Sequence, residues 1–336
     1  MFAMQLSRPA PVEDLPLQPV DLPVPRPSAG QVLLRVTACG VCRTDLHICE
    51  GDLTAPRLPL VPGHQAVGVV ELTGAGVERV QVGQRVGAAW LASACGACPA
   101  CRRGEENLCP QARFTGLHAH GGFAEWMLAE ADFLYTLPGE ISDRQAAPLL
   151  CAGIIGYRAL RKAGVQPGER LGLFGFGASA HLAIQIARYW ECEVCVFTRA
   201  AAHRRHAESL GAAWSGSPDE PPPVPLDCAV LFAPAGEIIP LALNALRPGG
   251  RLAVNALHAS PIPAMPYQTL YGERSLTSVA NATRQDGADL LRLAVEIPLR
   301  ADTSLYPLDE ANEALLDLKH SRLNGEAVLE VAAGLG

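Results

Sequence analysis

From residue 169 onward the sequence alternates between short apolar runs and amphipathic runs, and this alternation constrains the fold most strongly. ERLGLFGFG (169–177) predicts a strand, ASAHLAIQIARYW (178–190) a helix and CEVCVFT (192–198) a second strand. LDCAVLFAP, IIPLALNAL and GGRLAVNAL continue the pattern. Strands that alternate with helices form parallel, doubly wound sheets, so this half of the chain is predicted to be α/β.

The first part of the chain has a different pattern. QVLLRVTACG (31–40), HQAVGVVELTG (64–74) and VGQRVGAAW (82–90) are rich in β-branched residues and bounded by turn residues, as strands are. ISDRQAAPLLCAGIIGYRALRKAG (141–164) has helical spacing. At 336 residues, the chain is therefore predicted to form a β-rich domain followed by the α/β domain.

Composition removes several classes of function. The net charge of −7 gives no support for binding to nucleic acid or to an anionic membrane surface. The start, MFAMQLSRPAPVEDLP, does not resemble a signal peptide, and no apolar run is long enough to span a bilayer. We expect a cytoplasmic protein, in which clustered cysteines favour metal binding or catalysis over disulfides.

A glycine-rich turn follows the first strand of the α/β region. Gly175, Gly177 and Ala180 form a G-x-G-x-x-A motif between the predicted strand and the helix after it. The glycines allow a tight turn and close approach of a pyrophosphate to the helix N-terminus, and the alanine allows the helix to pack closely. This context predicts a dinucleotide site.

The residues after the second strand bear on the choice of dinucleotide. An acidic residue there would bind the 2′-hydroxyl of NAD(H), but the chain has Thr198 and Arg199, with Arg204 nearby. The cations favour NADP(H) over NAD(H), although arginines on a helix are often only solvated.

Four cysteines lie close together in the segment CGACPACRRGEENLC. Thiolates at this spacing can converge on one tetrahedral Zn²⁺, and four protein ligands leave no open position. The segment therefore predicts a structural zinc site. Its ligands would be Cys95, Cys98, Cys101 and Cys109.

Two cysteines and a histidine from separate segments offer a second ligand set. Cys42, His64 and Cys151 would leave a fourth position of a zinc ion open, as in catalytic sites. From spacing alone this inference is weak, because a histidine after Pro-Gly is more often structural.

Nearly the whole chain resembles the zinc-dependent medium-chain alcohol dehydrogenases. The matching segments are CGVCRTDLH, PLVPGHQAVGVV, the four-cysteine segment, GGFAEW, LLCAGIIGYRAL and GFGASAHLAIQIA. The resemblance implies a GroES-like β-barrel at 1–150, completed by 288–336, and a Rossmann domain at 151–287. It implies a catalytic zinc at Cys42, His64 and Cys151, a structural zinc at the four cysteines, and a homodimer or homotetramer.

The same resemblance implies roles for residues around the catalytic zinc. Asp45 would hydrogen-bond the imidazole of His64. Thr44 would take the proton of the alcohol, and His47 would pass it toward solvent. Arg43 would contact the cofactor pyrophosphate, and Trp90 would line the substrate pocket.

The chain departs from the family pattern at two positions that matter here. Many relatives have Glu after the histidine ligand, where this chain has Gln65, and this change either alters metal exchange or is a neutral amide of no kinetic role. RLNGEAVLEV also lacks an Arg that often follows its glycine, which puts an inherited cofactor preference in doubt.

The sequence thus predicts a zinc-dependent oxidoreductase that interconverts alcohols and aldehydes or ketones with NAD(H) or NADP(H). A polyol-type dehydrogenase is an alternative, but such enzymes often have Glu where this chain has Cys151. A non-catalytic redox or zinc sensor that binds the cofactor is the alternative outside enzymes.

Overall fold

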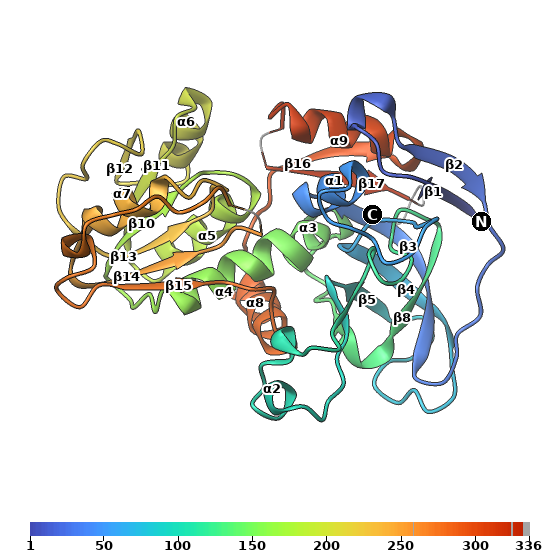
Figure 1. Cartoon of the computed structure of the whole chain (residues 1–336). Coiled ribbons are helices and arrows are strands. Elements are labelled where there is room, and N and C mark those ends of the chain that lie inside the picture. Colours follow the sequence, from blue (N-terminus) through green and yellow to red (C-terminus); the bar gives the residue numbers. More distant parts are fainter. Residues whose placement is uncertain (258, 324, 332–336) are drawn as a thin grey trace. The chain divides into compact units, whose positions relative to one another are not determined.

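The computed structural model describes residues 1–257, 259–323 and 325–331, and these form two compact units. The first unit contains Met1–Cys151, Asn281–Glu296 and the chain from Arg300 on; the second contains Ala152–Ala280 and Ile297–Leu299. Figure 1 shows the elements of both. Within the described ranges no helix combines the length and apolar character needed to cross a membrane.

The first unit is built on a seven-stranded sheet with the order β16-β17-β3-β4-β5-β9, and β8 also pairs with β3. Two short sheets, β1-β2 and β6-β7, accompany it. The strands are β1 (Phe2–Leu6), β2 (Leu17–Asp21), β3 (Gln31–Val41), β4 (Ala66–Thr73), β5 (Arg85–Ala88), β6 (Leu91–Ser93), β7 (Arg113–Phe114), β8 (Trp126–Glu130), β9 (Leu134–Thr136), β16 (Thr303–Pro307) and β17 (Glu326–Glu330).

The helices of this unit are short and connect or cover the strands. They are α1 (Arg43–Glu50), α2 (Pro99–Arg102), α3 (Asp143–Pro148), α8 (Arg284–Glu296) and α9 (Ala311–Lys319). Single helical turns of other types are η1 (Val12–Asp14), η2 (Glu106–Leu108), η3 (Ala131–Phe133), η4 (Leu149–Gly153) and η6 (Leu308–Glu310).

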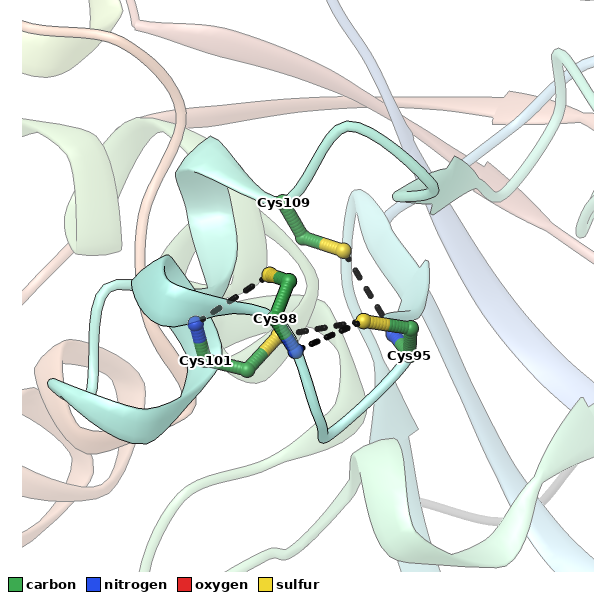
Figure 2. A group of neighbouring side chains, drawn as sticks. All are labelled: Cys95, Cys98, Cys101 and Cys109. Carbon is green, nitrogen blue, oxygen red and sulfur yellow. Dashed lines mark hydrogen bonds between the residues drawn. The ribbon is translucent and has the colours of Figure 1, made fainter.

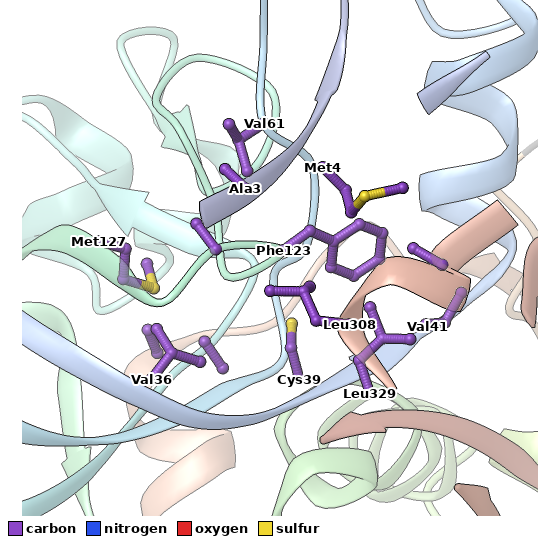
Figure 3. Close-up of a cluster of buried hydrophobic side chains, with 14 of the residues drawn as sticks. Ala3, Met4, Val36, Cys39, Val41, Val61, Phe123, Met127, Leu308 and Leu329 are labelled. Carbon is purple, nitrogen blue, oxygen red and sulfur yellow. The ribbon is translucent and has the colours of Figure 1, made fainter. Parts of the chain in front are cut away.

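The core of the first unit joins segments from both ends of the chain. Phe123 is fully buried among side chains from β1, β3 and β17, including Met4, Cys39 and Leu329 (Figure 3). β17 pairs antiparallel with β3, so the C-terminal segment completes a sheet that begins near residue 31. Burial of these apolar side chains is the main stabilising term for such a sheet.

The second unit is a parallel six-stranded sheet with the order β12-β11-β10-β13-β14-β15. Numbered along the chain, this is the 3-2-1-4-5-6 order of a doubly wound dinucleotide fold, which confirms the predicted class. Its elements are β10 (Arg170–Phe174), β11 (Glu193–Phe197), β12 (Trp214–Gly216), β13 (Leu226–Leu231), β14 (Leu246–Val254), β15 (Ser275–Ser278), α4 (Ile154–Lys162), α5 (Ala178–Tyr189), α6 (Ala201–Ser209), α7 (Ile238–Ala245) and η5 (Tyr267–Thr269).

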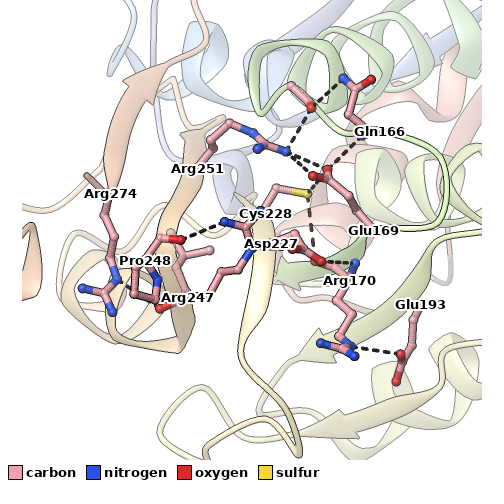
Figure 4. Close-up of polar contacts among 12 residues, drawn as sticks. Gln166, Glu169, Arg170, Glu193, Asp227, Cys228, Arg247, Pro248, Arg251 and Arg274 are labelled. Atoms are coloured by element: carbon pink, nitrogen blue, oxygen red, sulfur yellow. Dashed lines mark hydrogen bonds and ion pairs between the residues drawn. The ribbon is translucent and has the colours of Figure 1, made fainter. Parts of the chain in front are cut away.

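Ion pairs gather where the central strands of this sheet begin (Figure 4). Arg251 binds both oxygens of Glu169, at 2.6 and 2.8 Å, and the Arg247 Nε lies 2.6 Å from the Asp227 carboxylate. Glu169 directly precedes β10, whereas the glycine-rich turn follows it. The charged network therefore lies at the opposite end of the strand from the predicted cofactor turn, and its role is structural.

Candidate metal and cofactor sites

Cys42, His64 and Cys151 come together within the first unit. Their ligand atoms all lie within 4.8 Å of one another, and the Cys42 Sγ is 3.3 Å from the His64 Nε2. Two thiolates and an imidazole are a donor set that suits Zn²⁺ and leaves one position open. The residues present therefore fit the metal that the sequence predicts.

Helix α1 positions the first of these ligands. Cys42 is its N-cap, and the Cys42 Sγ accepts a hydrogen bond of 3.3 Å from the Thr44 N–H. The N-terminal end of a helix favours negative charge, but the neighbouring Cys151 side chain and burial raise the pKa of Cys42 well above its ordinary value. The side chain of Asp45 closes the capping box by accepting from the Cys42 N–H at 3.0 Å.

The same carboxylate orients the imidazole. The Asp45 Oδ1 lies 3.1 Å from the His64 Nδ1 and also accepts from the Gly63 N–H at 3.1 Å. When Nδ1 carries the proton, the lone pair of the His64 Nε2, on the side that faces Cys42, is available to a metal ion. Burial lowers the pKa of His64, but Asp45 and the Cys42 sulfur raise it well above its ordinary value.

Cys151 lies in a segment that is helical, as its spacing predicts. Within residues 141–164, however, α3 ends at Pro148 and a π-helical turn, Leu149–Gly153, separates it from α4. Proline has no N–H to donate, which weakens the regular helical ladder there. π-Turns occur often at functional sites, and this one carries the third ligand.

The residues predicted for proton transfer lie on the same short helix. Arg43 is exposed, while Thr44 and His47 are half-buried. The His47 Nδ1 lies 2.9 Å from the Asp52 Oδ2. The sequence analysis did not identify Asp52, and its only signal is its place directly after Gly51, which ends the helix.

Trp90 packs against the candidate metal site. Its ring meets the ring of His64 edge-on with centroids 4.8 Å apart, and it stacks on Phe114 at 4.9 Å. The indole N–H donates to the Asn281 Oδ1 at 3.0 Å, and the Asn281 amide in turn donates to the Asn107 carbonyl at 3.5 Å. Asn281 thus links Trp90 to the four-cysteine loop, a role that the sequence analysis missed.

The four cysteines of that loop also converge (Figure 2), with their sulfur atoms within 4.8 Å of one another. Backbone N–H groups donate to three of the sulfurs: Cys98 N to Cys95, Cys101 N to Cys98, and Cys95 N to Cys109. Backbone N–H groups of Ala97 and Cys98 lower the pKa of Cys95 to about 6. Four converging sulfurs, three of which accept from backbone N–H groups, fit a closed tetrahedral zinc site.

The glycine turn in the second unit matches the geometry that a pyrophosphate needs. Gly175 has φ +92°, which disfavours a side chain, and Gly177 is the N-cap of α5. A Cβ added at Gly177 would meet no atom within 4 Å, so space is open at the helix N-terminus. Ala180 is fully buried, as close packing of the helix requires.

The residues after β11 present both polar and charged groups. Thr198 is buried and Arg199 is exposed, and the Arg204 Nη1 donates to the Thr198 carbonyl at 3.2 Å. Arg199 also helps to lower the pKa of Glu237, after the larger effects of Ser260 and of the Glu237 backbone N–H. The Glu237 carboxylate is therefore close enough to Arg199, a predicted cofactor-binding residue, to interact with it electrostatically.

Comparisons with known proteins agree with this geometry. Residues 28–139 match the family model described as "Alcohol dehydrogenase GroES-like domain". The chain is 47% identical over 335 residues to a probable alcohol dehydrogenase, AdhA, of Mycobacterium tuberculosis, covering 98% of this chain and 97% of that one. A cinnamyl alcohol dehydrogenase from Sorghum bicolor superposes with a TM-score of 0.90 at 27% identity, covering 99% and 98% of the two chains. A structure described as an NAD-dependent alcohol dehydrogenase gives a TM-score of 0.89 at 27% identity, covering 99% of this chain and 100% of that one.

Proposed function

This chain belongs to the zinc-type medium-chain alcohol dehydrogenases, and we propose that Cys42, His64 and Cys151 hold its catalytic zinc. The chain is an alcohol dehydrogenase that interconverts alcohols with aldehydes or ketones. The observation that supports the proposal best is the convergence of these three ligands from separate segments, with Asp45 holding the imidazole.

The residues around the site have complementary roles. When bound, zinc polarises the substrate oxygen, and the nicotinamide cofactor accepts or returns the hydride. In the oxidation direction the hydroxyl of Thr44 accepts the alcohol proton, and His47 passes it toward solvent. Asp52 holds the His47 Nδ1, which leaves the other ring nitrogen for the proton transfer. Trp90 covers one side of the His64 ring, which excludes water there and limits the substrate on that side.

Cys95, Cys98, Cys101 and Cys109 would hold a second zinc in a structural role. A closed site of four thiolates has no position for substrate. Its contribution would be to fold a segment that has few buried apolar side chains of its own.

The pyrophosphate of the cofactor would lie on the turn at Gly175 and Gly177. The absence of an acidic residue at the end of β11, with Arg199 exposed there, supports NADP(H) over NAD(H). Replacing Arg199 by Ala would then raise the KM for NADP(H) by about 10-fold or more, because a charge-assisted hydrogen bond to the 2′-phosphate is lost. An equal change of KM for NAD(H) would contradict this preference.

The reaction and the metal content can be tested together. The purified protein should contain two zinc ions per chain by elemental analysis. Reduction of NADP⁺ and NAD⁺ should be measured with short, long and aromatic alcohols, and oxidation of the reduced cofactors with the matching aldehydes. Two bound zinc ions without turnover of any pair would favour the sensor hypothesis instead.

We further propose a homodimer or homotetramer that uses the edge of the second unit's sheet. β15 is an edge strand among the described strands, and Tyr267 and Tyr271, which precede it in the chain, are 71% and 67% exposed. Exposed backbone groups of an edge strand and neighbouring aromatic side chains favour pairing with a second copy. A monomeric mass in light scattering at micromolar concentration would contradict this.

A reducing, cytoplasmic location is proposed from the cysteines. All 11 are free thiols, and seven belong to the two candidate metal sites. Such thiols remain available as metal ligands only where disulfides do not form.

A further inference from the structure

Two buried polar side chains lie beside the candidate catalytic metal site. Gln65, directly after the ligand His64, is 0% exposed, and Glu326 on β17 is 1% exposed. Among the residues that the structure describes, neither the amide atoms of Gln65 nor the carboxyl oxygens of Glu326 have a hydrogen-bond partner. Buried polar groups are nearly always paired, so this exception requires an explanation.

The sheet register brings Glu326 to the metal site. In the antiparallel pairing of β17 with β3, Ala327 lies opposite Val41. Glu326 directly precedes Ala327, and the ligand Cys42 directly follows Val41. The end of this strand pair therefore places a buried carboxyl next to the segment that supplies the first ligand.

Gly40 makes room for the amide of Gln65 on the same strand. The Gly40 N–H donates to the Gln65 carbonyl at 3.1 Å, and a Cβ built on Gly40 would lie 2.8 Å from the Gln65 Cδ. The amide thus occupies the space that a larger residue at position 40 would fill. It is held against β3, the strand that leads directly to Cys42.

Electrostatics indicate that the two side chains interact. Burial raises the pKa of Glu326 to about 8, and the Gln65 amide is the group that lowers it most, followed by His64. Asp45 raises it again. The strand pairing supports this contact: Val328 lies opposite Gly40, so Glu326, two residues earlier, faces the same side of the sheet as the Gln65 amide that fills the space at Gly40.

A carboxyl group can fix the orientation of a neighbouring amide. A Gln side chain has a donor end and an acceptor end, and the carbonyl oxygen of a carboxyl accepts from the donor end whether or not the group is ionised. We propose that Glu326 is a positioning residue of the Cys42–His64–Cys151 site, which orients the buried Gln65 amide and so fixes the backbone that carries His64. Asp45 holds the imidazole ring, and the Gln65–Glu326 pair holds the main chain beneath it. The pair slows loss of the metal, and this inference rests on the proposed zinc site.

The test is the rate at which the purified holoprotein transfers zinc to excess 4-(2-pyridylazo)resorcinol. Glu326→Gln, which is nearly isosteric, should release zinc from the Cys42–His64–Cys151 site about 10-fold faster, the usual lower bound for residues that orient a metal ligand. Cys42→Ser identifies that kinetic phase, because only the four-cysteine phase should remain in it. Glu330→Gln, an exposed residue on the same strand, is the matched control and should release zinc at the wild-type rate.

Exchanging the two side chains, Gln65 and Glu326, tests the contact between them directly. Gln65→Glu alone places two carboxyls in one buried space, so it should also release zinc about 10-fold faster. Gln65→Glu combined with Glu326→Gln restores one carboxyl and one amide, and its release rate should return to within about 3-fold of wild type. A merely structural role would not give this rescue, and thermal unfolding of each variant checks that it is folded.

The outcomes separate this inference from the proposed function. A wild-type release rate in Glu326→Gln, or rates that simply multiply in the double variant, would overturn the inference and leave the zinc site in place. A wild-type protein that holds zinc only at the four cysteines would overturn both.

Discussion

The two candidate zinc sites lie in the same unit but are assembled in different ways. The structural candidate takes all its ligands from one loop, between Cys95 and Cys109, and backbone N–H groups of that loop donate to its sulfurs. The catalytic candidate takes ligands from the start of α1, the loop before β4 and a π-turn. Its geometry therefore depends on the whole sheet.

This difference explains how each site is supported. The sulfurs of the four-cysteine loop need few hydrogen-bond donors from elsewhere, because backbone N–H groups of the same loop supply them. The dispersed site depends on the buried carboxylate of Asp45, which contacts Cys42, Gly63 and His64 at once. We expect substitutions around the dispersed site to affect catalysis, and substitutions in the loop to affect mainly stability.

The largest effect is expected for removal of a dispersed ligand. His64→Ala should lower kcat/KM by at least about 1,000-fold, or about 4 kcal/mol, because the Lewis acid is lost from the substrate oxygen. Zinc content should fall from two ions to one per chain, with the circular dichroism spectrum unchanged. Retained activity would refute the assignment of the catalytic site.

A smaller effect is expected for the residue that orients the ligands. Asp45→Asn keeps the shape, but an amide cannot accept from every N–H group that the carboxylate serves. We expect a 10- to 100-fold loss of zinc affinity or kcat/KM, measured with a competing chelator and by steady-state kinetics. Asp14→Asn, an exposed carboxylate of the same unit, is the control and should behave as wild type.

Substitution of a ligand in the four-cysteine loop should lower the stability of the protein more than its catalytic rate. Cys98→Ser removes one ligand of the structural site, so the loop should lose zinc and become sensitive to limited proteolysis. The thermal midpoint should fall, while kcat of the folded fraction stays within about 3-fold of wild type. A loss of kcat as large as that of His64→Ala would erase the distinction between the sites.

The smallest effect is expected where the two sites are linked. Asn281→Gly removes the hydrogen bonds to Trp90 and Asn107 and tolerates the φ of +52° at this position. Loss of one such bond should lower kcat/KM about 3-fold through movement of Trp90. Asn281→Asp retains an acceptor for the indole and should be closer to wild type; the reverse order would rule out this link.

The local features of this chain could be predicted from its sequence, but the tertiary ones could not. The cysteine loop and the glycine turn each lie in one short segment, where spacing alone limits the geometry. Cys42, His64 and Cys151 could be grouped only through the family resemblance, since no pattern along the chain connects them. Asn281 had no signal and Asp52 had only its place after Gly51, because their partners are set by the fold. Glu326 occupies the position after Gly325 where the family's Arg is missing, but no pattern in the sequence placed it beside Gln65. The helical spacing of residues 141–164 likewise did not reveal the π-turn.

The spacing of the ligands along the chain also determines the order in which the sites can form during folding. Closing the segment from Cys42 to Cys151 costs roughly 2 kcal/mol more chain entropy than closing the segment from Cys95 to Cys109. The loop can therefore bind its metal while the rest of the chain is still unfolded. The other site becomes available only after β3, β4 and the π-turn have met, so its occupancy reports that this part of the protein has reached the native state.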